Sequence, residues 1–490
     1  MSHTVTEPVA RETTTGPEPA GELRPDSIGT GHIVFLVLAA AAPLAALVLT
    51  IPLSIGFGNG IGTPGAYAFA GIVLALFAVG YAAMSRYVVS ASGFYAYVTL
   101  GLGRPAGLAA AFVATLAYNA VSICLPSVFG FFAAAIMADQ LGIDFSWQLW
   151  AAVAFCLCAF LSSREITLSA RVLGVALVLE VLVLLVFDVV TLFDRGLSGY
   201  SLTSLAPGTV LDGAAGVSIM YAFSVFIGFE ATAIYGEEAR DPRRTVARAT
   251  YIAIAIISVF YVITSWSLLA AYGNAEAPGT AAADPGNFLL NAQTSIVGSA
   301  QHTIVSFLLL TSLFAAYLAF HQAAGRYMYA LGRERLLPRA LGRTSSKTGA
   351  PYVAIRVNLA LQLILTIVFV ATDQDPYLAV GAGLIGLGTI CLIALQGAAS
   401  FSVAAFFWRR HDGHWWTTRV APLLGGAGLV LALVLSLRNF SLLTGTTASW
   451  FEALPWLMLG AALLGAGYAL FLRSSRPERY AQMAESVRKT

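Results

Sequence analysis

The chain has 490 residues, of which 58% are hydrophobic and only 11% are charged. Soluble domains carry about 25% charged residues, so this chain lacks the polar side chains to cover a water-exposed surface of its size. The composition therefore excludes an ordinary soluble protein, and a formal net charge of +2 gives no indication of a nucleic-acid partner.

The first 31 residues are rich in Pro, Thr, Gly and Glu, which predicts a disordered cytoplasmic tail rather than a signal peptide. A helix needs about 20 apolar residues to cross a bilayer. Residues 33–85 contain no charge, which is enough for two spans. The apolar runs predict an all-α membrane protein with about twelve transmembrane helices, at residues 33–54, 66–88, 106–137, 147–163, 170–193, 212–236, 249–272, 301–328, 352–371, 378–407, 420–439 and 451–472.

The basic residues of the predicted loops indicate an orientation. With both termini in the cytoplasm, 25 of the 27 Arg and Lys residues fall on the cytoplasmic side, and only Arg195 and Arg438 fall outside. Cytoplasmic loops carry an excess of basic residues, so this asymmetry favours both the orientation and the span count. We expect a multi-pass protein of the plasma (inner) membrane, because no organellar signal is visible.

Two prolines interrupt the first predicted span. Pro43 and Pro52 lack an N–H, which frees the carbonyls of Ala39 and Val48. Freed backbone groups in lipid cost several kcal/mol unless a polar group meets them. The small side chains around Pro43 would allow a solute to approach, although a simple proline kink against a neighbouring helix explains the same pattern.

Two carboxylates lie at membrane depth. Glu180 stands among aliphatic residues in the fifth span, and Glu230 follows Gly228 in the sixth. A charge at the bilayer centre costs roughly 2.5–3.5 kcal/mol and usually has a function. Glu180 must therefore face the bundle interior, whereas Glu230 is either functional or a protonated structural residue. Asp188 lies nearer the outer face, where it is either functional or merely interfacial, and His321 is either a packing residue or a proton relay.

The first and sixth spans are both interrupted, and they lie five spans apart. Two broken helices at matching positions in two halves indicate an inverted-repeat transporter with its site near the midplane. The broken ends offer helix N-termini to an anion and freed carbonyls to a cation.

Four stretches resemble the amino acid–polyamine–organocation permeases: Gly93–Gly107, Ser162–Leu182, Phe226–Ala249 and Ala324–Ile355. The third is the most diagnostic, since it combines a Gly-aromatic-acid step with a following EE and DPRR. With the span count, the likeness covers roughly residues 33–472.

The resemblance implies the leucine-transporter-type fold, with discontinuous helices 1 and 6. Residues 32–193 and 194–411 would form two inverted repeats of five spans, followed by two peripheral helices in 412–472 and a cytoplasmic tail, 473–490. It also implies a secondary transporter that moves an amino acid, or a related amine or polyamine, by alternating access with H⁺ or Na⁺ coupling. We expect a monomer or homodimer in the lipid bilayer, without cofactor or metal.

In this family a Gly-Ser-Gly-like stretch of the first helix holds the substrate carboxylate, and this chain lacks those glycines. The matching place lies near Ala45–Leu47. Glu180 and Glu230 are the candidates for ion coupling or gating. The candidate substrate-binding residues are Ala42, Pro43, Leu44, Ala45, Ala46, Tyr118, Asn119, Ser224, Phe226, Ile227 and Gly228.

The missing glycines leave a second hypothesis open, a membrane sensor or scaffold that kept the fold and lost transport. An enzyme is not expected. Only Glu180 and Glu230 could form an acid pair, and no His or Cys accompanies them. No phosphate-binding GxxxxGK[ST] run indicates ATP-driven transport.

Overall fold

The structure is a computed structural model that describes residues 29–87, 93–163, 170–230, 242–345, 350–411, 413–443 and 449–483. Within these ranges every regular element is a helix and no strand occurs. The predicted tail residues 1–28 and 484–490 lie outside the described residues. So do residues 231–241, which comprise the end of the predicted sixth span and the first part of the charged run after it. So do residues 164–169 and 346–349 of the resembling stretches.

Nine helices in the described part of the chain are long and apolar enough to cross a membrane. Their composition and length agree with a multi-pass membrane protein. They are α3 (Thr63–Met84), α5 (Arg104–Leu141), α7 (Ala170–Arg195), α11 (Pro242–Tyr272), α14 (Ser299–Arg333), α15 (Tyr352–Ala371), α16 (Gly383–Arg410), α17 (Ala421–Arg438) and α18 (Leu454–Ser475).

Three shorter apolar helices coincide with the remaining predicted spans, the first, fourth and sixth. They are α2 (Pro43–Phe57), α6 (Trp147–Ser163) and α9 (Ala215–Ser224). The first span is divided, because α1 (Thr30–Ala41) ends just before α2 begins. The sixth is short because α9 ends at Ser224 and the chain continues as turns to Glu230.

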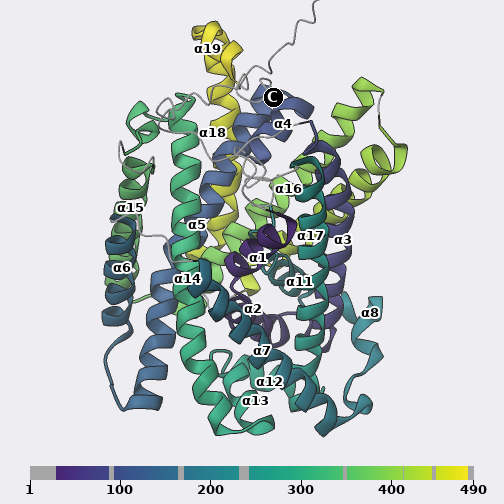
Figure 1. The fold of residues 1–490 in the computed structure, drawn as a ribbon, viewed down its shortest axis with the longest axis vertical. Coiled ribbons are helices and arrows are strands. Elements are labelled where there is room, and N and C mark those ends of the chain that lie inside the picture. Colours follow the sequence, from purple (N-terminus) through teal and green to yellow (C-terminus); the bar gives the residue numbers. More distant parts are fainter. Residues whose placement is uncertain are drawn as a thin grey trace, which may run out of the picture.

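The remaining helical elements are short and lie between or beyond the long helices. In Figure 1, α4 and α19 lie near the upper end of the molecule, and α8, α12 and α13 near the lower end. These elements are α4 (Phe94–Leu102), α8 (Pro207–Val210), α12 (Ala277–Ala283), α13 (Phe288–Ile296), α19 (Pro477–Gln482), the 3₁₀ turns η1 (Gly60–Gly62), η2 (Leu197–Gly199), η3 (Leu202–Leu205), η5 (Arg339–Gly342), η8 (Phe440–Leu442) and η9 (Ser449–Ala453), and the π-helical η6 (Pro376–Ala382) and η7 (Trp416–Val420).

Short helices lie at both ends of the part of the chain that the structure describes. Helix α1 begins at Thr30, inside the expected tail. At the other end, Arg104 donates from Nη2 to the carbonyl of Ala481 at 3.1 Å, and its guanidinium lies 4.9 Å from the ring centre of Tyr480. These contacts hold α19 against the start of α5.

Helix α2 lies in the interior of the bundle. All of its residues from Pro43 to Ile55 except Ala46 are buried. It packs against α7, α9, α12 and α14, and Figure 1 shows it near the centre of the molecule. The outer helices differ, since α15 and α18 expose large aliphatic side chains such as Ile364 and Leu463. An apolar outer surface of this kind is suited to lipid rather than water.

Candidate functional site

The first helix break lies at Ala42. This residue has φ 44° and ψ 70°, in the left-handed region. A non-glycine residue held there costs of the order of 1–3 kcal/mol, so the surrounding structure must enforce it. Pro43 follows as the first residue of α2 and has no N–H to donate. The next amides, those of Leu44 and Ala45, therefore become the free donors of the new helix N-terminus.

Two other helices supply acceptors for these amides. Leu44 N donates to Glu180 Oε2 at 3.3 Å, and Ala45 N donates to Ser312 Oγ at 3.2 Å. The Ser312 hydroxyl donates in turn to Glu180 Oε2 at 2.8 Å. A carboxylate at a helix N-terminus is stabilised by the free N–H groups and by the helix dipole. Glu180, 3% exposed, thus caps α2 from α7, and its predicted inward orientation is confirmed.

Tyrosine hydroxyls meet the carbonyls of α2. Tyr261 donates to the carbonyl of Pro43, and Tyr377 donates to that of Val48, both at 3.2 Å. Val48 is the residue whose carbonyl Pro52 was predicted to free. At Pro52 the polar partner is therefore a side chain of the protein, which supports the alternative of a structural kink there.

The second helix break follows Ser224. The chain turns from Val225 to Glu230, and Gly228 adopts φ 109°, a conformation that favours glycine. Glu230 accepts from the amide of Gly228 at 3.0 Å through Oε2, and from the Tyr118 hydroxyl at 2.5 Å through Oε1. The side chain of Glu230 thereby bonds the backbone of its own turn at Gly228 and links this turn to α5 through Tyr118.

Aromatic residues from two further helices surround Glu230, which is 4% exposed. Tyr81 of α3 donates to the Glu230 carbonyl at 3.0 Å. The ring of Tyr327, on α14, stacks on that of Tyr118 with 5.0 Å between the ring centres. The carboxylate thus lies where α3, α5, α9 and α14 meet, and a movement of Glu230 would require these rings to move.

The two broken helices are joined at their other ends. Ser218 near the start of α9 accepts from Asn59 N at 2.9 Å and donates to the carbonyl of Ser54 at 3.0 Å. Ala214 N donates to the carbonyl of Gly58 at 3.2 Å. The end of α2 therefore meets the beginning of α9, and each helix runs from this junction toward its own break.

The structure distributes the predicted site residues over two clusters. Leu44 meets Glu180 at the first break, Ala45 reaches it through Ser312, and Tyr118 meets Glu230 at the second break. Phe226 and Ile227 are buried in the second turn. Two other predicted residues, Ser224 and Asn119, donate hydrogen bonds to described residues only within their own helices.

Ser224 donates back to the carbonyl of Tyr221 at 2.6 Å, and Asn119 donates to the carbonyl of Thr115 on its own helix at 2.7 Å.

Several residues of both clusters were missed by the reasoning from sequence: Ser312, Tyr261, Tyr377, Tyr81 and Tyr327. Ser312, Tyr261 and Tyr81 are polar side chains within apolar runs, and this is the signal that could have found them. Tyr327 and Tyr377 stand close to charged residues and carry no such signal. Serine and tyrosine are common enough in such runs that the signal is weak without knowledge of the packing.

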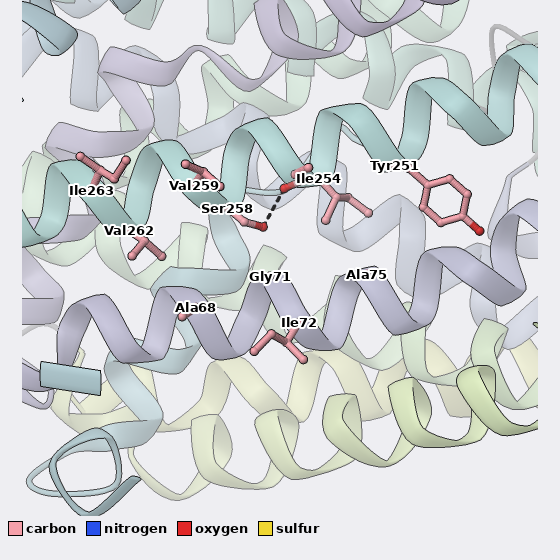
Figure 2. Close-up of a pocket in the computed structure, with 11 residues that line it drawn as sticks. Ala68, Gly71, Ile72, Ala75, Tyr251, Ile254, Ser258, Val259, Val262 and Ile263 are labelled. Atoms are coloured by element: carbon pink, nitrogen blue, oxygen red, sulfur yellow. Dashed lines mark hydrogen bonds between the residues drawn. The ribbon is translucent and has the colours of Figure 1, made fainter. Parts of the chain in front are cut away.

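A groove of about 410 Å³ lies elsewhere, between α3 and α11. Its walls are mostly aliphatic, and the hydroxyl of Ser258 in it donates to the carbonyl of its own helix at Ile254, at 2.6 Å (Figure 2). None of its lining residues belongs to either helix break. A groove with such mostly apolar walls suits a lipid chain rather than a charged solute.

Comparison with known proteins agrees with this architecture. The family model described as "Amino acid permease" matches residues 36–477. The chain is 25% identical to the branched-chain amino acid permease BcaP of Lactococcus lactis over 337 residues, which cover 64% of this chain and 70% of that protein. It is 26% identical to the L-lysine transport protein of Corynebacterium glutamicum over 298 residues, 57% of this chain and 56% of that protein.

A third relative, the proline-specific permease of Saccharomyces cerevisiae, is 29% identical over 170 residues, 33% of this chain and 27% of that protein. The matched family covers most of the chain, and these relatives are transporters rather than enzymes. The chain therefore belongs to the amino acid permeases of the amino acid–polyamine–organocation superfamily, and it is a membrane transporter.

Proposed function

We propose that this permease is a secondary active transporter that carries an amino acid across the plasma membrane by alternating access. The observation that carries the proposal is the pair of buried helix breaks, each occupied by a carboxylate of the protein, Glu180 in one and Glu230 in the other. Such breaks place helix ends and free backbone groups at membrane depth, where they can hold the charged ends of a solute.

Twelve spans in two inverted repeats, residues 32–193 and 194–411, remain our proposed architecture. Nine long and three shorter apolar helices among the described residues support this number. The junction of α2 with α9 at Ser218 supports a pairing of the first and sixth spans. The cytoplasmic location of both termini rests on the distribution of arginine, and the choice between monomer and homodimer stays a prediction.

The first break is suited to the carboxylate of the substrate. Glu180 already places an anion at the amide of Leu44, and Ser312 links it to the amide of Ala45. A helix N-terminus binds anions in general. In our proposal the substrate carboxylate replaces that of Glu180. The displaced Glu180 then takes up a proton, because a free carboxylate at membrane depth is costly. One proton therefore accompanies each amino acid.

The second break is suited to the ammonium group. The C-terminal end of α9 carries the negative end of the helix dipole, and Glu230 adds a carboxylate beside it. The relatives are named for branched-chain amino acids, lysine and proline, whose side chains differ widely. An α-amino acid head group is what these substrates share, and we propose that group as the one recognised here.

Counterflow into proteoliposomes of the purified protein tests the proposal. Vesicles loaded with one unlabelled amino acid should accumulate the same labelled amino acid, and a pH gradient should drive net uptake more strongly than a Na⁺ gradient. A panel of amino acids and small amines without any counterflow would contradict transport. Saturable binding without counterflow would favour instead a sensor of the same fold.

A further inference from the structure

A carboxylate that the proposed transport cycle does not use lies further along α7. Asp188 is 5% exposed and therefore lies in the interior of the bundle. The hydroxyl of Thr264 on α11 donates to its Oδ2 at 2.9 Å. Its other oxygen, Oδ1, is buried and has no hydrogen-bond partner among the described residues.

A second unpaired oxygen lies on the same helix face. Thr191 is three residues after Asp188, is 0% exposed, and its hydroxyl also lacks a partner among the described residues. Residues three apart on a helix are neighbours. Two buried oxygens one helical turn apart are therefore left without a hydrogen-bond partner among the described residues.

The facing helix adds further oxygens. α11 packs against α7, and its buried Ser267 lies three residues after Thr264. Ser267 Oγ lies 3.0 Å from the hydroxyl of Tyr200, a partly buried residue beyond the end of α7. Burial raises the pKa of the Tyr200 phenol, which stays neutral and covers the cluster from the aqueous end.

This arrangement calls for a positive charge. A buried polar atom without a partner costs about 1–3 kcal/mol, and more when it is charged, so such atoms are normally satisfied. The cluster provides one carboxylate and neutral hydroxyl oxygens, which balances a single positive charge. Divalent ions prefer several carboxylates. Ca²⁺, a hard cation, binds oxygen at roughly 2.3–2.6 Å. A monovalent cation of similar radius can bridge two oxygens that make no hydrogen bond to each other.

We propose that Asp188, Thr191, Thr264 and Ser267 form a binding site for one sodium ion between α7 and α11. Thr264 gives its proton to Asp188 and keeps its lone pairs for the ion. The site is separate from both helix breaks, and it does not depend on the transport proposed above.

Thermal unfolding of the purified full-length protein in nanodiscs tests this site, without any amino acid present. Ligand binding to the folded state raises the unfolding temperature. NaCl should therefore raise it above its value in choline chloride or KCl at equal ionic strength. Asp188→Asn and Thr191→Val should abolish the sodium-specific rise.

Asp194→Asn is the matched control, because Asp194 is an exposed carboxylate on the same helix, 3.1 Å from Arg195. It should keep the full sodium response. Thr191→Val keeps the shape and the Asp188 charge, so it decides the matter if Asp188→Asn does not fold. No sodium-specific rise in the unaltered protein, or an undiminished rise in Thr191→Val, overturns the proposal and leaves the transport proposal untouched.

Discussion

Single side chains hold the two helix breaks in place, and Glu180 is the one with the largest expected effect on transport. It lies between the amides of α2 and the hydroxyl of Ser312. In the proposed cycle it changes between a negatively charged and a neutral form. The proposed exchange of carboxylates depends on the protonation of Glu180. The shape of the site depends only on its hydrogen bonds.

Glu180→Gln should separate these two contributions. The amide oxygen of Gln can still accept from Leu44 and Ser312, but it cannot take up a proton. We expect uptake driven by a pH gradient to fall by about 5–150-fold, the range of a typical coupling free energy, while counterflow persists. Ser312→Ala serves as the control, with a smaller loss in both assays. Unchanged pH-driven uptake in Glu180→Gln would refute the proton role.

Tyr118 is the residue that ties Glu230 to α5. Tyr118→Phe removes the 2.5 Å hydrogen bond but keeps the ring stacked on Tyr327. A hydrogen bond to a carboxylate contributes roughly 1.5–3 kcal/mol, so the free energy of unfolding should fall by about that amount. Tyr97→Phe is the control, because the buried Tyr97 hydroxyl has no partner among the described residues. Equal losses in the two variants would contradict this role.

At the scale of the element, the broken helix α2 depends on partners from other helices. Its first amides are capped from α7 and α14, and its freed carbonyl at Val48 is met from η6. In water these groups would be hydrated, but lipid provides no such partners. The stability of α2 is therefore a property of the bundle rather than of its own sequence.

A double-mutant cycle tests the partner of the kink at Pro52. Tyr377→Phe should lower the free energy of unfolding by about 1–3 kcal/mol, because it leaves the Val48 carbonyl unpaired. In a Pro52→Ala background the restored amide at position 52 can donate to that carbonyl. The cost of Tyr377→Phe should then become smaller, and the difference is the coupling energy. Additive effects of the two substitutions would show that Tyr377 does not replace the missing helix bond.

At the scale of the whole molecule, the arginine distribution predicts which end of the bundle faces the cytoplasm. Helix α7 ends at Arg195, one of the two basic residues assigned to the outside, and the end of α18 belongs to the arginine-rich side. Cytoplasmic loops carry an excess of Arg and Lys, so these two ends should lie on opposite sides of the membrane.

Cysteine labelling of intact cells tests this orientation. In a background without the four native cysteines, Ser198→Cys should react with a membrane-impermeant maleimide from outside. Ser475→Cys, also exposed, should react only after permeabilisation. The opposite pattern would show that the chain is inserted the other way round, and labelling of both from outside would show that the span count is wrong.

The sequence by itself determined that this chain is a membrane protein. It also determined the positions of the apolar runs and of the interruptions in the first and sixth spans. These are local properties, since charge-free length, a proline without N–H and a glycine with positive φ act within a few residues. The inward position of Glu180 also followed from sequence, because a carboxylate that faces lipid at membrane depth is energetically costly.

Only the tertiary structure decided which groups meet at the breaks. Glu180 and Leu44 are 136 positions apart, and Tyr118 and Glu230 are 112 apart. Contacts over such separations depend on how helices pack and rotate against each other, which no local pattern specifies. For the same reason the position of Asp188 in its span does not specify its partners, whereas the packing of α11 against α7 encloses it and brings Thr264 to its carboxylate.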